Sequence, residues 1–440
     1  MKTSSEKSTT AQREGRKARR EPVAITGAGC VFRNEVGIEA LWNSVENASA
    51  ADRHAPMAHA SLAEFPAVRH LSDPRMMKAV SAVDGFALAA VEDLRKSGGF
   101  TSGLPCSAHD LGIYVGAAPA YAVDNINYAD AVLAACNDPT NLPDTVAFGR
   151  KSMDARPNTL LVGLPNNVLC YSSMIFGAQG PNSNYTSFDM SGHLAVTAAM
   201  RRLQTGQIDL AVAGAYGGPT EKAHAVSVAW IAEGEEKFKT SQETLQTPAT
   251  SPSARLTDGA FFMTLERASS ATERNANVIA TILGHAHFSD GPGNLSPSCD
   301  TTTVELVITE SLDDAGVSAE QIGLVLWSST GDAAIDKTFL STLSRVFAKR
   351  RELPALGDSA GAVGYLVEPA GLPELLLAGR IWARGAVPAA MQVVSPDAAS
   401  TGAFPQKIPQ NTTNILVIRT SLLGESSAFV LTPGTLGDLH

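Results

Sequence analysis

The chain has 440 residues, of which 44% are hydrophobic and 18% charged, and a formal net charge of −10 at pH 7. A chain of this length can bury a large core, and this composition is typical of a globular α/β protein. The negative charge argues against a nucleic-acid-binding protein, which usually presents a net basic face. No apolar run is long enough for a membrane span or a signal peptide, so we expect a cytoplasmic protein without a membrane or nucleic-acid partner.

The polar and reactive residues show no cofactor or metal signature. The five cysteines are scattered without a CxxC pair, and no histidine cluster has metal-ligand spacing. The sequence Gly27-Ala28-Gly29 lacks the third glycine of a dinucleotide fingerprint and is better explained as a packing turn. We therefore expect free thiols, no metal and no cofactor.

The chain is predicted to consist of a tail (1–21) and two halves (22–270 and 271–440). The tail carries seven Lys/Arg and two Glu over residues 1–20, and we expect it to be disordered. After it, an apolar strand over 22–29 enters a glycine turn, and a helix follows over 38–46. The rest of the first half is predicted to hold a helix over 77–94, a strand over 111–118, an irregular excursion over 119–157, a helix after Asp189, a strand over 208–214, a polar loop over 233–253 and a strand over 258–266.

The second half repeats the alternation of strands and helices. It is predicted to hold a strand over 277–283, a helix over 302–315, a strand over 322–327, helices over 339–350 and 371–380, and strands over 415–419 and 428–432. Alternation of this kind indicates sheets with helices on both faces. Two such halves indicate a duplicated, layered α/β unit.

The segment 180–193, Gly-Pro-Asn-Ser-Asn-Tyr-Thr-Ser-Phe-Asp-Met-Ser-Gly-His, places a carboxylate at the start of a helix. Asp189 can accept backbone N–H bonds from the first helical turn and complement the helix dipole, which is worth about 1 kcal/mol. His193 lies four residues further along the same helical face. Asp189 is therefore either a helix N-cap or, with His193 and with Ser191 or Tyr365, an acid/base pair of a hydrolase or dehydratase.

The order of these pieces resembles the β-ketoacyl synthases of the thiolase superfamily over residues 22–433. Besides the opening strand and the segment 180–193, three stretches match in character: 258–284, 311–326 and 371–388. The resemblance implies the thiolase fold, an α/β fold of five αβαβα layers built from two similar halves. It also implies a dimer across the strand around Thr186 and the segment 158–173.

Condensation in this family requires a cysteine thiolate, which accepts the acyl chain, and two histidines that assist decarboxylation and stabilise the oxyanion. Carried over one residue at a time, the cysteine position is Asp189 and the two histidine positions are Ser328 and Tyr365. The family's gate loop corresponds to residues 421–426. The resemblance thus implies a chain without catalytic residues.

A synthase-like chain without the cysteine is similar to the chain length factor (KSβ) of type II polyketide synthases. That subunit forms a heterodimer with a catalytic ketosynthase and shapes the tunnel in which the acyl chain grows, and acyl carrier protein is an indirect partner. Its best-known members have glutamine at the cysteine position, so Asp189 is a departure, as is the loss of both histidines. The positions that correspond to pocket or interface residues are Thr159, Leu160, Leu161, Leu164, Val168 and Leu422.

Two other functions stay open at this point. One is a stand-alone enzyme that uses Asp189 and His193 as acid and base. The other is a homodimeric scaffold that binds an acyl carrier or a product without transforming it.

Overall fold

The computed structural model describes residues 20–48, 62, 64–118, 131–136, 144–153, 162, 164–220, 256–291, 297–393 and 404–434. The basic tail up to residue 19, the predicted polar loop 233–253 and the candidate positions Thr159, Leu160 and Leu161 lie outside these residues. No helix among the described residues is both long enough and apolar enough to cross a membrane.

The described strands form two arrays with the same internal order, joined into one sheet system. The first array runs β4 (Asn182–Tyr185), β3 (Leu111–Gly116), β5 (Leu210–Gly217), β6 (Gly259–Arg267) and β1 (Val23–Phe32). The second runs β9 (Ala355–Asp358), β8 (Ile322–Ser328), β10 (Asn414–Thr420), β11 (Glu425–Pro433) and β7 (Ala280–Ser289).

The pairing directions repeat as well as the order. In each array the first three strands are parallel, and the remaining neighbours are antiparallel. The two arrays meet where β1 pairs with β7, with Val23 opposite Ile282 and Ile25 opposite Ala280. The fold is therefore an internal duplication, as the repeated alternation in the sequence predicts.

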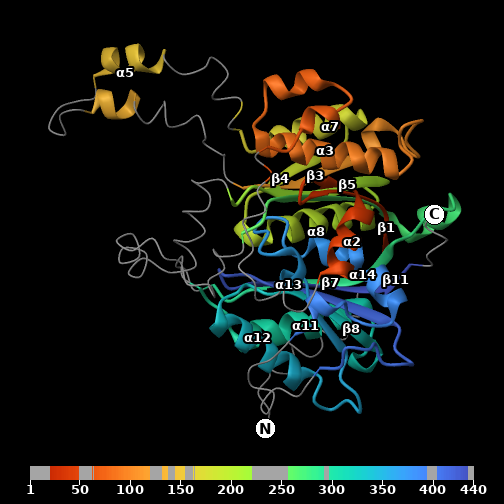
Figure 1. Cartoon of the computed structure of the whole chain (residues 1–440). Coiled ribbons are helices and arrows are strands. Elements are labelled where there is room, and N and C mark those ends of the chain that lie inside the picture. Colours follow the sequence, from red (N-terminus) through yellow and green to blue (C-terminus); the bar gives the residue numbers. More distant parts are fainter. Residues whose placement is uncertain are drawn as a thin grey trace, which may run out of the picture.

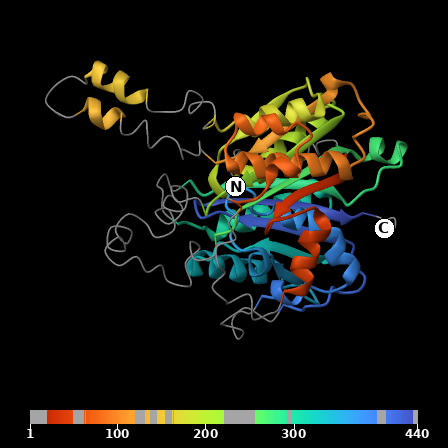
Figure 2. The same cartoon turned by 45° about the horizontal axis from the view of Figure 1, so that its top comes forward.

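Helices cover both arrays and fill the space between them (Figure 1). In this view α3 (Ala82–Ser97) and α7 (Asn167–Phe176) lie on the outer face of the first array, and α11 (Thr301–Ala315) and α12 (Ala333–Val346) on that of the second. The middle layer holds α8 (Ser191–Gln204) and α14 (Leu372–Arg384). The turned view in Figure 2 shows the same succession of layers. These are the five layers expected from the sequence.

The core is divided by the same layers. The ten residues of β1 are all buried, because this strand has helices on both faces. One apolar cluster fills the middle layer and includes Ile25, Val196, Phe261 and Leu376. Two further clusters lie under the outer helices, one beneath α3 and α7 and the other beneath α11 and α12.

Local capping explains why some helices begin at residues other than the predicted ones. The helix expected from residue 77 begins at Ala82, because Ser81 and Asp84 form a capping box. The helix expected from residue 339 begins at Ala333, because the carboxylate of Asp332 accepts the N–H groups of Ala334 and Ile335. The excursion expected to be irregular contains α5 (Thr145–Ser152), which Asp144 caps.

Short elements complete the described part of the chain, and sequence analysis identified few of them. They are β2 (Glu35–Val36), α2 (Ile38–Asn47), α10 (Ala268–Glu273), α13 (Ala360–Val363) and the 3-10 turns at 67–69, 74–78, 108–110, 188–190, 319–321 and 389–391.

Gly116, at the end of β3, allows α8 to start directly against the sheet. A Cβ at this position would lie 2.6 Å from the carbonyl carbon of Ser191 and 2.8 Å from the nitrogen of Gly192. We expect Gly116→Ala to lower the free energy of unfolding by about 2–3 kcal/mol, because backbone has to move. Urea denaturation measures this change.

Gly149→Ala is the matched control, because a Cβ there meets no atom within 4 Å. Since Gly149 lies within α5, we expect this change to be neutral or stabilising by up to about 1 kcal/mol. Equal losses of stability in the two variants would contradict the close approach at Gly116.

Candidate functional site

The chain makes a strained elbow between β4 and α8. Phe188 has a φ of 47°, a left-handed conformation that is uncommon for a bulky residue. The Ser191 hydroxyl accepts the Ser187 N–H (2.9 Å) and donates to the Phe188 carbonyl (2.8 Å), so it holds the elbow. The second half has an equivalent elbow at Val367, with a φ of 54°, before α14. Both elbows lie at the start of a middle-layer helix.

Asp189 follows the strained residue and is fully buried. Its Oδ2 accepts hydrogen bonds from the Tyr365 hydroxyl (2.9 Å), the Arg419 guanidinium (2.7 Å) and the Leu422 N–H (3.1 Å), and its Oδ1 accepts the Ser421 hydroxyl. No side-chain cap bond is present at the start of the 188–190 turn or of α8. The prediction that Asp189 caps its own helix is therefore wrong, since groups far along the chain occupy both oxygens.

Arg419 supplies the counter-charge and was missed by the sequence analysis. Its side chain is fully buried at the end of β10 and forms an ion pair with Asp189. Its other nitrogen, Nη1, donates to the backbone carbonyls of Ser328 (2.5 Å) and Ser329 (3.4 Å). Burial is the largest influence on the pKa of Arg419 and lowers it, but the charge and hydrogen bond of Asp189, together with Tyr365 and Glu374, outweigh burial, so this pKa is raised. The signal in the sequence was a lone arginine in the apolar strand Ile-Leu-Val-Ile-Arg-Thr.

The structure brings the three predicted positions Asp189, Ser328 and Tyr365 into one network. Tyr365 lies beside the ion pair, with the Arg419 guanidinium 5.4 Å from its ring centre. Burial and the negative charge of Asp189 raise the pKa of Tyr365 well above its ordinary value, so the phenol stays a donor. Ser328 takes part mainly through its backbone carbonyl, and its hydroxyl lies 3.4 Å from Arg419.

His193 is buried one turn into α8 and belongs to a different environment. Its ring meets the ring of Phe429 edge-on at 5.1 Å, and neither ring nitrogen forms a hydrogen bond within the described residues. Burial, helped by Arg419 and His287, lowers the pKa of His193 to about 3. The ring is therefore neutral at ordinary pH, and no hydrogen bond or ion pair among the described residues joins it to Asp189.

Further carboxylates hold the segments around the network. Asp358 accepts the N–H and hydroxyl of Ser329 at 3.0 and 2.8 Å. Asp336 accepts the N–H and hydroxyl of Thr330 at 3.0 and 2.8 Å, and burial raises its pKa to about 7. These two side chains fix the turn that follows Ser328, the last residue of β8.

Apolar side chains fill the space beside Asp189. Five buried residues form a separate small cluster there, with Phe188 and Cys299 packed against it; its buried members are Leu256, Ile335, Tyr365, Val367 and Leu422. Leu422 is 0% exposed. The network is thus sealed by the chain's own side chains. No group of three potential metal ligands occurs among the residues that the structure describes.

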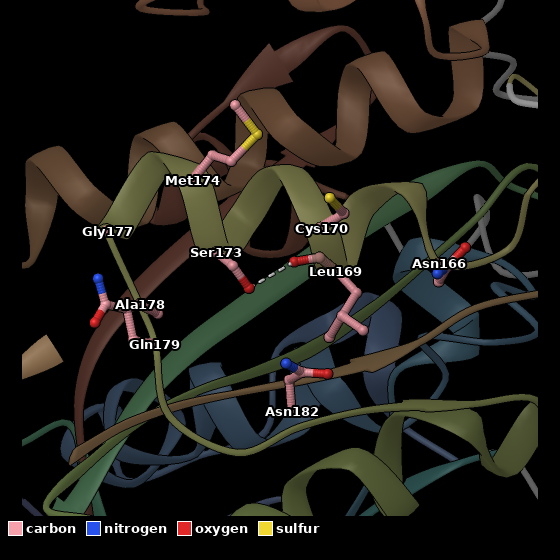
Figure 3. A pocket seen from close by; sticks show the side chains of 9 residues that line it. All are labelled: Asn166, Leu169, Cys170, Ser173, Met174, Gly177, Ala178, Gln179 and Asn182. Carbon is pink, nitrogen blue, oxygen red and sulfur yellow. Dashed lines mark hydrogen bonds between the residues drawn. The ribbon is translucent and has the colours of Figure 1, made fainter. Parts of the chain in front are cut away.

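The other pocket candidates lie on or near α7, where Leu164 and Val168 differ in exposure. Leu164 is 43% exposed, whereas Val168 is fully buried in the core of its own half. Next to them α7 and β4 border a groove of about 500 Å³ (Figure 3). Its lining includes Leu169, Ser173 and Asn182, and Met174 stands 62% exposed at the same site.

The ion pair should behave as a unit. Arg419→Met leaves the Asp189 carboxylate buried without a counter-charge, and we expect it to lower the free energy of unfolding by about 3–5 kcal/mol. The double variant Asp189→Leu/Arg419→Met removes both charges and should recover most of this loss. A double-mutant cycle by urea denaturation tests the coupling, and losses that simply add would contradict it.

Glu374, in the first turn of α14, should couple stability to pH. Burial raises its pKa from 4.5 to about 7, against the hydrogen bond from Ser359. Between these values the folded state keeps a proton that the unfolded state releases, so this contribution to the free energy of unfolding falls as pH rises. Relative to the parent chain, Glu374→Gln should gain about 3 kcal/mol between pH 4 and pH 8. Urea denaturation at both pH values measures the difference, and a pH-independent one would contradict the assignment.

Comparison with known proteins shows which family this architecture is typical of. Residues 20–232 match the family described as "Beta-ketoacyl synthase, N-terminal domain", and residues 279–393 match "Beta-ketoacyl synthase, C-terminal domain". The "3-oxoacyl-[acyl-carrier-protein] synthase, mitochondrial" of Arabidopsis thaliana is 26% identical over 59% of this chain and 56% of its own, so the chain spans about half of that relative. The "Putative polyketide beta-ketoacyl synthase 1" of Streptomyces virginiae is 22% identical over 93% of this chain and 97% of its own.

Solved structures show the same fold. A β-ketoacyl synthase from Burkholderia phymatum superposes with a TM-score of 0.72 at 18% identity and covers 94% of this chain and 99% of its own. "The ishigamide ketosynthase/chain length factor" superposes with a TM-score of 0.71, also at 18% identity and with the same coverage. The two family matches together take in most of the chain, which therefore belongs to the β-ketoacyl synthase family and has its thiolase fold.

Proposed function

We propose that this chain is a non-condensing, ketosynthase-like subunit of the chain length factor type, which pairs with a catalytic ketosynthase in type II polyketide or polyene biosynthesis. The observation that carries the proposal is the state of Asp189. Both of its carboxylate oxygens are occupied by protein donors, and one of these donors is a buried arginine. The position predicted to hold the nucleophile is thus a closed structural network.

Among the described residues, the surroundings of Asp189 do not favour condensation. Acyl transfer requires a nucleophile that can reach a thioester, with donors aimed at the developing oxyanion. Here Asp189 is buried in an ion pair, and the Leu422 N–H and Tyr365 hydroxyl point at its carboxylate. Apolar side chains take up the neighbouring space.

The geometry also disfavours acid/base chemistry by Asp189 and His193. A general base has to reach the proton that it abstracts, directly or through one water. Asp189 already accepts four hydrogen bonds, and the lowered pKa of His193, about 3, keeps its ring neutral. Neither group is exposed to a substrate.

The face formed by β4 and α7 supports an association role. β4 is the last strand of its array, so one side of it has no neighbour among the described strands. Such an edge is a ready template for pairing with another chain. The groove beside it is lined by Leu169 and Ser173 on the side of α7 that faces Asn182 (Figure 3).

Two structural neighbours support the choice of partner. One is a ketosynthase/chain length factor, and another is a type II PKS acyl-carrier protein in complex with its ketosynthase. A subunit of this kind would act through the shape of the tunnel in which the acyl chain grows. Each methylene group that the tunnel admits or excludes is worth about 0.8 kcal/mol. The candidates for tunnel contacts are Thr159, Leu160, Leu161 and Leu164.

Co-expression with a ketosynthase encoded next to this chain tests the pairing. We expect a stable 1:1 complex on size exclusion. Met174→Glu places a charge beside the groove and should weaken the complex at least tenfold, whereas Leu306→Glu, a 39% exposed position on the opposite outer layer, should leave it intact. A chain that stays homodimeric in the presence of the ketosynthase would overturn the pairing and favour the homodimeric scaffold.

Incubation of the purified chain with acyl carrier protein thioesters tests the lack of catalysis. We expect no acylated protein and no turnover by mass spectrometry. The Asp189→Cys variant should stay inactive, because a thiol there would still lie beneath Leu422 and beside Arg419. Covalent acylation of the parent chain, or hydrolysis of the thioester that depends on Asp189, would contradict this expectation and favour the hypothesis of a stand-alone enzyme.

A further inference from the structure

The four residues 421–424 connect β10 to β11 and lie directly over Asp189; we call them the closing loop. On its inner side the Ser421 hydroxyl donates to Oδ1 of Asp189, and the Leu422 N–H donates to Oδ2 at 3.1 Å. The Leu422 side chain is buried in the small apolar cluster beside the carboxylate. One carboxylate therefore holds two successive residues of the loop.

The outer side of the closing loop contacts a second segment. The Leu422 carbonyl accepts the Ser298 N–H at 3.0 Å, and the Gly424 carbonyl accepts the Asp290 N–H at 2.9 Å. The Ser298 hydroxyl also donates to Asp290 at 2.7 Å. Gly424 has a φ of 81°, and a side chain there would clash with Asp290. The loop is thus held between Asp189 and the residues around 290 and 298.

Asp189, which binds the closing loop, is also paired with a positive charge. Arg419, just before the loop on β10, pairs with the same Oδ2 that accepts the Leu422 N–H. Hydrogen bonds to an ionised acceptor are about twice as strong as those between neutral groups. Burial strengthens them further, because water does not compete at a fully buried carboxylate.

We propose that Asp189 is a latch that holds the closing loop shut over the buried site. The ion pair with Arg419 fixes the carboxylate in place, and the carboxylate binds the loop through Ser421 and Leu422. With the latch in place, the closing loop forms a fixed wall of the buried site instead of a mobile one. This inference goes beyond the proposed function and does not depend on the partner.

Amide hydrogen exchange of the chain alone tests the latch. In the parent chain the Leu422 amide should exchange slowly, because it is buried and bonded to Asp189. Ser421→Ala, which keeps the ion pair, should speed its exchange about tenfold, and Asp189→Ala should speed it more. Val430, in the middle of β11, is the internal reference for global unfolding. Gly149→Ala is the control variant, since a Cβ at this position on α5 meets no atom within 4 Å.

The thiol of Cys299 gives a second readout, because Cys299 packs against the cluster that contains Leu422. Burial raises its pKa to about 12, so the thiol should react slowly while the loop is shut. In a background with Cys106, Cys136 and Cys170 changed to serine, Ser421→Ala should raise its rate of reaction with a thiol reagent about tenfold. Gly149→Ala should leave this rate unchanged.

Three outcomes would overturn the latch. The first is fast exchange of the Leu422 amide in the parent chain. The second is unchanged exchange and thiol reactivity in both Ser421→Ala and Asp189→Ala. The third is an equal change at Leu422 and Val430, which would mean general destabilisation. Since no partner is present, none of these results bears on the pairing with a ketosynthase.

Discussion

The buried ion pair between Asp189 and Arg419 organises the centre of this molecule. It joins the elbow of the first half to the last strands of the second, across 230 positions of the sequence. A charge pair in such a place is expensive to desolvate, and it is tolerated only when its remaining hydrogen-bonding groups are well satisfied. Tyr365, Ser421, Leu422 and the carbonyl of Ser328 supply most of these bonds, whereas the Nε of Arg419 has no partner among the described residues.

The duplicated architecture explains why these groups meet. Each half starts a middle-layer helix after an elbow residue with positive φ, Phe188 in one half and Val367 in the other. The carboxylate comes from the first half, whereas the arginine and the tyrosine come from the second. The site is therefore assembled only when both halves are packed together, and its polar contacts depend on the same middle layer that forms the apolar core.

Much of the fold was predictable because buried strands such as β1 and β10 are continuous apolar runs. The four-residue strand β9 and the true start of α12 were missed, since neither a short strand nor the Asp332 cap stands out from local pattern. At the site, the resemblance named Asp189, Ser328 and Tyr365, and the structure places these three residues in one network. Local reasoning then gave Asp189 the wrong role: a helix-start carboxylate looks like a cap, and its real partner lies on a strand far away in sequence.

The ion pair also has a consequence for the history of the chain. A cysteine at position 189 would leave the Arg419 guanidinium buried without its counter-charge, and loss of Arg419 alone would strand the carboxylate. A change at either position alone thus leaves one buried charge without its partner. Variation at positions 189 and 419 therefore has to be concerted, because the chain tolerates both charges together or neither of them.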